Sequence, residues 1–383
     1  MKKFRTGIVG AGFIGIAHVE ALRRLGNIDV VALSERYNCK EKAKQLFIEH
    51  AYEDFKKMID EQELDFVHIC TPNNTHFQIA KYALENNINV ILEKPMTFTV
   101  EEAEILTKLV DENNLINAVN FHNRLYPTSI HIKNLIQTKE IGDIITINGS
   151  YLQDWLLYDT DYSWRLNSKE SGLTRAVADI GSHWMDLVEY LTGLKIVEVL
   201  AEFKTQYPIR KKPIGNVESF SNKKNDDYEP VEIDTEDLAL LVFKFNNGAI
   251  GSSTISQVSA GNKNNLNVQI SGTKASLNWS LPDLENIHVG YRDQPNKIIP
   301  KDYSMTSDAT SAIDYPAGHT EGFPDAIKQV FKEVYNQPND KHYADFSDGL
   351  RQMVLSDKIY ESAKNRKWIK IEEWKTWKWK SDY

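Results

Sequence analysis

Three short segments combine residue types and spacings that could carry chemistry. Gly10–Gly15 has the pattern GxGxxG, whose glycines let a pyrophosphate lie against backbone amides where a strand turns into a helix. Lys94, within the tripeptide Glu93–Pro95, could donate a hydrogen bond to a substrate hydroxyl, although such a lysine is also common as a surface cation. Asp179 and His183 are four residues apart and would share a helix face. There the carboxylate either orients the histidine as a general base or stabilises the helix start.

An acidic residue supports the dinucleotide interpretation of the glycine pattern. Glu35 lies 20 residues beyond Gly15, at the end of the second apolar run. That position suits a carboxylate that accepts hydrogen bonds from the adenosine ribose hydroxyls, whereas the alternative is a solvated acid at a strand end. Arg36 could meet the 2′-phosphate of NADP, but Glu35 would repel that phosphate. We therefore expect NAD as the cofactor, with NADP disfavoured.

The elements that must position these residues follow from the periodicity. From residue 4 to about 120, short apolar runs alternate with helical segments. This alternation is typical of βα units and predicts a parallel sheet covered by helices. The tripeptide Glu93–Pro95 follows the predicted strand Val90–Leu92, at the sheet edge where α/β proteins bind ligands. We expect an α/β Rossmann domain over residues 1–124.

The remaining chain, residues 125–383, has a different sequence pattern. Between Val197 and about Gly290 most segments alternate apolar and polar residues, and Asn247-Gly248 predicts a β-hairpin. A mostly antiparallel sheet is therefore expected, in a second domain of the α+β class. Its predicted helices are Ser129–Gln137, Asp179–Leu191, Gly322–Tyr335 and Phe346–Asn365.

Composition restricts the partners and the compartment. The 383 residues carry a formal net charge of −9, which would repel a phosphate backbone, so a small-molecule substrate and no nucleic acid are expected. No apolar run reaches the length of a membrane span, and the N-terminal segment lacks the features of a signal peptide. Cys39 and Cys70 have no CxxC spacing, which argues against a disulfide framework or a zinc cluster. We expect a cytoplasmic protein with no metal and no membrane contact.

Two further segments each allow two interpretations. The polar stretch Pro208–Asp234 is interpreted as a surface loop rather than an arm that reaches a neighbouring subunit. The C-terminal stretch Trp368–Tyr383 interleaves Lys and Trp. Such interleaving can bind nucleic acid, but the negative net charge favours packing on its own domain or on a subunit partner.

Taken together, these segments resemble the Gfo/Idh/MocA oxidoreductases, which include inositol dehydrogenases and glucose–fructose oxidoreductase. The resemblance covers almost the full length, and the combination of GxGxxG with EKP and DxxxH is specific. The matching segments are GIVGAGFIG, Glu35, Cys70–His76, Glu93–Pro95, Asn120–Pro127 and Asp179–Asp186.

The resemblance implies a large open-faced sheet in the second domain, through which relatives associate, and hence a homodimer or homotetramer. It implies that Lys94, Asp179 and His183 are catalytic, and that the Lys94–Pro95 bond is often cis. The cofactor-binding positions expected from the motif and the resemblance are Gly10, Gly12, Phe13, Ile14, Gly15, Glu35, Arg36, Thr71, Pro72, Asn73, His76, Glu93, Lys94 and Arg124. The expected substrate positions are Lys94, Trp155, Trp164, Arg165, Asp179, His183 and His319. The aromatic positions among them, which could stack on a sugar, are equally ordinary core residues.

The implied reaction is hydride transfer between nicotinamide and a secondary alcohol of a sugar, glycoside or cyclitol. His183 would accept the hydroxyl proton, Lys94 would hydrogen-bond the developing alkoxide, and Asp179 would orient His183 or pair with Lys94. Whether lysine or histidine is the proton acceptor stays open, as do the substrate, the direction and the release of cofactor at each turnover. Two alternatives are a glycosidase that acts by transient oxidation and elimination, and a regulatory protein that binds cofactor without chemistry. The three catalytic residues together argue against the latter.

Overall fold

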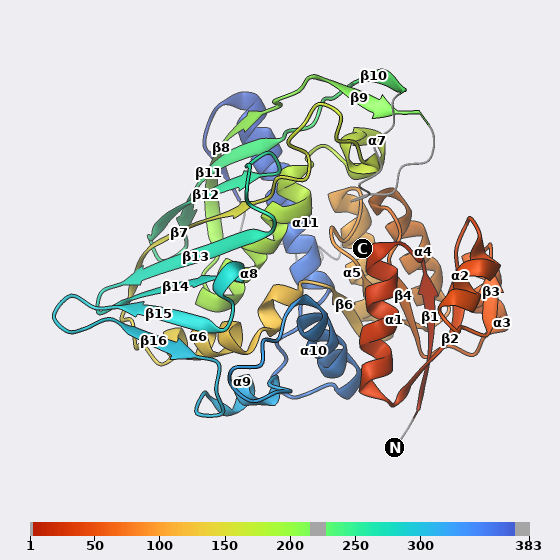
Figure 1. Cartoon of the computed structure of the whole chain (residues 1–383), viewed down its shortest axis with the longest axis horizontal. Coiled ribbons are helices and arrows are strands. Elements are labelled where there is room, and N and C mark those ends of the chain that lie inside the picture. The colour runs from red at the N-terminus through yellow and green to blue at the C-terminus, as the bar shows by residue number, and fades with distance from the viewer. Residues whose placement is uncertain (1–2, 215–226, 372–383) are drawn as a thin grey trace, which may run out of the picture. The chain divides into compact units, whose positions relative to one another are not determined.

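The computed structural model describes residues 3–214 and 227–371, and the chain divides into two compact units (Figure 1). The first unit combines residues 1–127 with 308–353, and the second combines 128–307 with 354–383. Each of the three boundaries between these segments falls within a helix, namely α6 (Pro127–Gln137), α9 (Ser307–Ser311) and α11 (Phe346–Asn365).

The first unit contains a parallel sheet with the strand order β3-β2-β1-β4-β5-β6. Strand β4 and the last four residues of β1 are buried, as expected for a sheet covered on both faces. The order reverses between β1 and β4, which creates the edge where doubly wound folds bind ligands. The predicted Rossmann fold is therefore confirmed. The strands are β1 (Phe4–Val9), β2 (Ile28–Ser34), β3 (His50–Tyr52), β4 (Phe66–Ile69), β5 (Asn89–Leu92) and β6 (Asn117–Val119). The helices are α1 (Phe13–Leu25), α2 (Cys39–Gln45), α3 (Phe55–Glu61), α4 (Asn73–Glu85), α5 (Val100–Asn113), α10 (Phe323–Asn336) and a 3₁₀ turn at His122–Leu125.

Residues 308–353 join the first unit, although the sequence pattern assigns them to the domain that begins at 125. Helix α10 packs on α1, where the rings of Phe13 and Phe323 stack 6.1 Å apart and Arg24 pairs with Asp325 at 2.6 Å. Further along the helix, the Tyr335 hydroxyl lies 2.8 Å from the Thr6 hydroxyl in β1. This amphipathic helix completes the cover of the sheet, which no local pattern near residue 320 reveals.

The second unit contains a sheet with the order β16-β15-β14-β13-β7-β12-β11-β8-β17, in which β7 and β12 are parallel and all other pairs are antiparallel (Figure 1). The expected mostly antiparallel sheet is confirmed, and so is the hairpin at Asn247-Gly248, where Gly248 has φ +88°. The strands are β7 (Ile144–Leu152), β8 (Ile196–Lys204), β11 (Leu238–Phe245), β12 (Ile250–Ser256), β13 (Asn265–Gly272), β14 (Ser276–Ser280), β15 (Asn286–Gly290), β16 (Lys297–Pro300) and β17 (Ile369–Lys370).

One face of this sheet carries the core. Along β11 buried and exposed residues alternate, so one face packs on helices and the other is open. Helix α8 (Ser182–Thr192) lies against the buried face, where the Trp184 indole donates to the Asn267 carbonyl at 3.0 Å. A Cβ on Gly149 would lie 2.6 Å from that indole nitrogen, so only glycine allows α8 to approach β7 this closely. Trp184 and Gly149 thereby fix the helix that carries His183.

The helix predicted over Asp179–Leu191 differs at its start. Residues Val177–Gly181 form a π-helical turn, and α8 follows from Ser182. The turn widens the backbone just where Asp179 lies, a deviation that often occurs at functional sites.

The polar stretch Pro208–Asp234 is more ordered than a loop. Strands β9 (Ile209–Pro213) and β10 (Tyr228–Glu232) pair antiparallel and form a two-stranded ribbon, while residues 215–226 lie outside the described part. Of the Lys- and Trp-rich terminus only Trp368–Ile371 is described. There β17 pairs with β8, and the Lys244 ammonium lies 4.6 Å from the centre of the Trp368 ring. Its expected packing beyond Ile371 falls outside the described residues.

Candidate active site

The three glycines of the first loop have separate structural roles. Gly10 has φ +92°, and a Cβ there would lie 2.9 Å from the backbone of Cys70. A Cβ on Gly15 would lie 2.0 Å from the Gly10 carbonyl oxygen, so glycine is needed for helix and strand to meet. Around Gly12, the residue before α1, nothing lies within 4 Å of a Cβ position. The open space at this helix N-terminus fits a pyrophosphate, which the unpaired N–H groups and the helix dipole would bind.

Glu35 lies beside this loop. Its carboxylate accepts hydrogen bonds from the Ala11 N–H at 2.9 Å, the Arg36 N–H at 2.9 Å and the Lys42 ammonium at 3.0 Å. Burial raises the pKa of Glu35, but these donors outweigh it and lower the pKa below its ordinary value. The side chain is 16% exposed, so an ionised carboxylate remains accessible at the end of β2. This is the group expected to bind ribose hydroxyls.

The segment after β4 is tied to the segment after β5 by a buried histidine. The two ring nitrogens of His76 lie 2.8 Å from the Thr71 carbonyl oxygen and 3.0 Å from that of Pro95. Thr75 donates to the Pro72 carbonyl and closes the first turn of α4, which begins at Asn73. His76 therefore connects the backbones of two predicted cofactor loops from within the core.

Glu93 points into the core of the first unit. One of its carboxylate oxygens accepts from Asn120 at 2.6 Å and lies 3.0 Å from Nε2 of His18. Burial opposes ionisation, yet His18, Asn120 and the charge of Lys94 lower the pKa of Glu93 to about 2. The His18 ring also contacts His68, with 3.0 Å between the two Nδ1 atoms. The buried contacts of Glu93 therefore fix the start of the loop that follows β5. Its predicted ribose contact stays a prediction.

Lys94 follows directly, half-buried at the carboxyl edge of β5, and the Lys94–Pro95 peptide is cis, as the resemblance led us to expect. Arg124 is buried and pairs with Asp348 in α11 at 3.0 Å. It is therefore held by an ion pair within the first unit.

The remaining predicted positions of the first unit lie near the surface. Phe13 is 66% exposed despite its contact with Phe323, and Arg36 lies over the Tyr37 ring at 5.3 Å. Ile14 in α1 is partly exposed. His319 is exposed, with Nδ1 3.3 Å from the Pro316 carbonyl oxygen.

In the second unit the structure brings Asp179 and Arg165 together, with 3.5 Å between Oδ1 and Nε. His183, one residue into α8, is 4% exposed, and its ring centre lies 6.3 Å from that of Tyr151. Arg165 also covers the Trp164 ring at 4.6 Å. Trp155 instead packs against Leu156 and its apolar neighbours and donates to Gln153.

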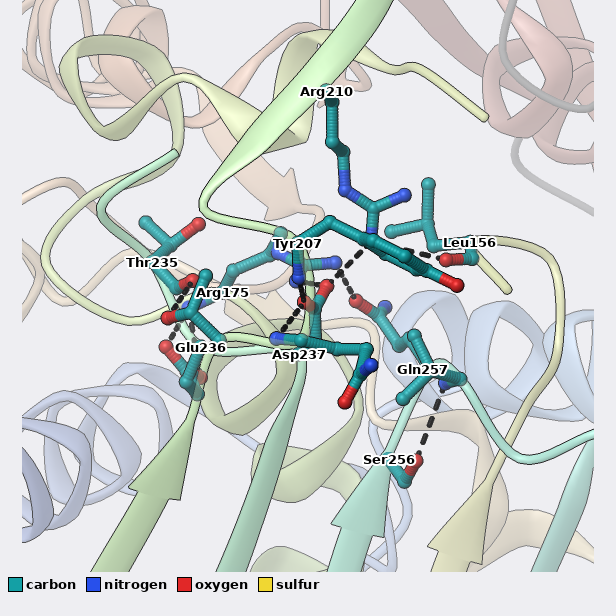
Figure 2. A network of polar contacts seen from close by, with 12 residues as sticks. Leu156, Arg175, Tyr207, Arg210, Thr235, Glu236, Asp237, Ser256 and Gln257 are labelled. Atoms are coloured by element: carbon teal, nitrogen blue, oxygen red, sulfur yellow. Dashed lines mark hydrogen bonds and ion pairs between the residues drawn. The ribbon is translucent and has the colours of Figure 1, made fainter. Parts of the chain in front are cut away.

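The residues that hold Asp179 were not predicted from the sequence. Gln257, at the end of β12, donates to Asp179 Oδ2 at 2.8 Å and accepts from Arg175 at 2.9 Å. Figure 2 shows the continuation, in which Arg175 and Arg210 both bind the Asp237 carboxylate. Burial lowers the pKa of Arg175 against the effect of Asp237, and burial raises the pKa of the neighbouring Glu236. The sequence feature that could have indicated this buried cluster is the acidic pair Glu236-Asp237 directly before an apolar strand.

Comparison with known proteins agrees with this arrangement. A family model described as "Oxidoreductase family, NAD-binding Rossmann fold" matches residues 4–121, and the GFO/IDH/MocA C-terminal domain matches residues 130–278. Together with the glycine loop Gly10–Gly15 and with Glu35, the fold defines an oxidoreductase with an NAD-binding domain. The chain belongs to the Gfo/Idh/MocA family.

Several relatives span the full length. The chain is 26% identical to a levoglucosan dehydrogenase of Pseudarthrobacter phenanthrenivorans, over 97% of this chain and 99% of that protein. It is 24% identical to a glucose-6-phosphate 3-dehydrogenase of Bacillus subtilis, over 95% and 97% respectively. A solved structure of levoglucosan dehydrogenase in complex with NADH and L-sorbose has a TM-score of 0.87 and 25% identity, covering 97% of this chain and 100% of that one.

Proposed function

We propose that this protein is an NAD-dependent dehydrogenase that oxidises a secondary alcohol of a sugar, glycoside or cyclitol. The observation that carries the proposal is the cradle formed by Gly10–Gly15 and Glu35, in a chain that matches the family over both of its domains. The named relatives are sugar dehydrogenases, which favours net oxidation over the glycosidase alternative.

The cofactor would be held chiefly by the first unit. Gly12 and the first turn of α1, with Phe13 and Ile14, would receive the pyrophosphate, and Glu35 would accept the adenosine ribose hydroxyls. The segments at Thr71–Asn73 and at Glu93-Lys94 would border the nicotinamide ribose. Arg36 and Arg124 would make further contacts. When bound, NAD supplies a nicotinamide ring that takes up a hydride.

The protein's own groups would handle the proton and the charge. His183 would accept the proton of the substrate hydroxyl, because a neutral imidazole is a suitable base near pH 7. Lys94 would donate a hydrogen bond to the oxygen as negative charge develops there. Asp179 would hold the orientation of His183 or pair with Lys94.

The sugar ring would be recognised in the second unit beside Asp179. Trp155, Trp164 and Arg165 supply aromatic surface and hydrogen-bond donors, which suit the apolar face and the hydroxyls of a pyranose. His319 of the first unit is a further candidate contact.

A spectrophotometric assay tests the proposal. Purified protein is incubated with NAD or NADP and with levoglucosan, glucose, glucose 6-phosphate, methyl glucosides or myo-inositol, and NADH formation is followed by absorbance. We expect turnover with NAD and at least one polyol, with a smaller kcat/KM for NADP. Tight NAD binding by calorimetry without any NADH formation would contradict the dehydrogenase and favour the redox-neutral glycosidase or regulatory alternatives.

We also propose that the protein is cytoplasmic and forms a homodimer or homotetramer through the open sheet face. Leu240 and Val242 on β11 are 49% and 39% exposed on that face, and a second copy would cover them.

Cys39 and Cys70 are buried free thiols, which suits a reducing compartment. In the part of the chain that the structure describes, no helix has the length and apolar character to cross a membrane. Light scattering with wild type and L240D/V242D tests the assembly, and cell fractionation tests the location. A monomeric wild type or a periplasmic location would contradict these assignments.

A further inference from the structure

The Asp179 carboxylate lies at the end of a buried chain of polar side chains that the active-site motif does not include. The chain runs from Arg210 in the β9–β10 ribbon through Asp237 and Arg175 to Gln257 (Figure 2). From Gln257 it continues to Asp179. Arg175, Arg210, Asp237 and Gln257 are each at most 1% exposed. Solvent therefore cannot replace any of their contacts.

The contacts of Gln257 fix which way its amide faces. Arg175 has only N–H donors, so the Gln257 oxygen must face it, at 2.9 Å. The amide nitrogen must then face the other way, where Asp179 Oδ2 accepts its hydrogen bond at 2.8 Å. The backbone of Gln257 is held as well, because its N–H donates to the Asp237 carbonyl and its carbonyl accepts from the Leu156 N–H. Gln257 is thus a donor of fixed position for the Asp179 carboxylate.

Arg175 is in turn held by charge. Asp237 binds both guanidinium groups through one carboxylate oxygen, and its other oxygen accepts from the Gln206 N–H at 2.6 Å. Glu236 accepts the backbone N–H groups of Arg175 and Val177, which places a second carboxylate in the cluster. Two cations and two anions balance, which makes their burial tolerable, whereas one of them alone would be very unfavourable.

The ribbon contributes one of the two cations. Arg210 also donates to the carbonyls of Leu156 and Tyr158, at 3.0 and 2.7 Å. These contacts use several of the five donors of the guanidinium, which a lysine could not reproduce. The neighbouring Lys212 pairs instead with Glu229 near the surface.

We propose that Gln257 is a positioning residue that sets the orientation of Asp179 for the oxidation, and that Arg175, Asp237 and the ribbon residue Arg210 fix Gln257 in turn. This inference rests on the proposed function, because it requires that Asp179 acts in the oxidation. Asp179 also has a longer contact to the partly exposed Arg165, with 3.5 Å between Oδ1 and Nε.

Two substitutions at Gln257 separate positioning from a structural role. Q257L removes both side-chain contacts, whereas Q257E keeps an acceptor for Arg175 and removes the donor to Asp179. We expect both variants to lower kcat by about 10- to 100-fold, with the Kd of NAD unchanged within twofold. If Gln257 only stabilises the fold, Q257E will keep wild-type kcat. Thermal unfolding confirms that the variants are folded.

A double-mutant cycle with Asp179 gives the sharper result. In the D179N background, Q257L should change kcat by less than twofold, because Gln257 acts through that carboxylate. An undiminished loss in that background would overturn the proposal. If D179N is impaired while Q257L and Q257E are fully active, the dehydrogenase assignment stands and the positioning role is wrong. If D179N itself is fully active, there is nothing to position and the inference fails.

The ribbon has its own matched pair of variants. R210K should lower kcat about three- to tenfold, and K212M on the same strand should leave it unchanged. If R210K lowers the Tm but keeps wild-type kcat, Arg210 stabilises the fold and does not help to position Asp179. If wild-type protein oxidises no polyol, the proposed function fails separately. Crystal structures of wild type and Q257L then decide the geometry, since an unmoved Asp179 carboxylate in Q257L would contradict the positioning role.

Discussion

Glu35 in the first unit and Asp179 in the second are both proposed site carboxylates, but the side-chain or backbone donors that hydrogen-bond to them lie at different distances along the chain. Glu35 accepts from Ala11, Arg36 and Lys42, all within 24 residues. Asp179 accepts from Gln257, 78 residues away, which is itself oriented by a buried ion cluster. The contacts of the proposed cofactor carboxylate therefore come mainly from nearby sequence, whereas the hydrogen bond of Gln257 to Asp179 depends on long-range packing within the second unit.

This difference predicts a division of effects. Variants around Glu35 should change NAD affinity, and variants around Asp179 should change turnover. The following tests run from the largest expected free-energy effect to the smallest.

The largest effect is expected for H183A. Loss of the proposed base should lower kcat by about 100- to 10,000-fold, while the Kd of NAD stays within twofold of wild type. Stopped-flow absorbance and isothermal titration calorimetry measure the two quantities. The division between the units breaks down if H183A weakens NAD binding as much as a change at Glu35 does.

A stability effect of about 3 kcal/mol is expected for E93Q at pH 7. The folded pKa of Glu93 is about 2, below its ordinary 4.5, so the ionised carboxylate stabilises the fold above pH 4.5. This contribution is lost as pH falls towards 2. Urea unfolding should show a difference between wild type and E93Q that is smaller by about 1 kcal/mol at pH 3.5 than at pH 7. A pH-independent difference for E93Q would contradict the account.

For E35A we expect the Kd of NAD to rise about tenfold or more, because the ribose hydroxyls lose a charged acceptor. The preference for NAD over NADP should fall at the same time, since the repulsion of the 2′-phosphate is removed. Calorimetry with both cofactors measures this. Unchanged discrimination would show that Glu35 does not meet the ribose.

The smallest effect is expected for K42M. Lys42 is 35% exposed and its pair with Glu35 is correspondingly weak. The two backbone N–H groups continue to hold Glu35, so the Kd of NAD should rise less than threefold. A larger rise in calorimetry would mean that the Lys42 side chain, rather than the two backbone N–H groups, positions Glu35.

The sequence predicted the parts of the fold that depend on local pattern. GxGxxG between a strand and a helix, the βα alternation and the Asn247-Gly248 hairpin are all confirmed, because each is determined by neighbouring residues. The cis bond at Lys94–Pro95 followed from the resemblance alone. The site roles of Lys94, Asp179 and His183 stay predictions.

Features that depend on distant packing were missed. The ribbon in Pro208–Asp234 looked like a loop because its Lys, Glu and Pro residues have low strand propensity; pairing and the burial of Arg210 outweigh that preference. Helix α10 joins the first unit through contacts with residues about 300 positions earlier, such as Asp325 with Arg24. The π turn at Val177–Gly181 has no periodicity of its own and depends on Glu236, which accepts its N-terminal amide.

The buried charge balance also determines how this region opens. If the ribbon detached while the sheet stayed folded, Arg210 would leave and Asp237 would keep only Arg175 as its cation, with Glu236 still beside it. An excess buried anion is so unfavourable that partial opening is suppressed. Ribbon and sheet should therefore unfold as one cooperative unit. In hydrogen exchange, the Gln206 amide, which donates to Asp237, should be protected as strongly as the amides of β11, although Gln206 is an exposed residue in the connection after β8.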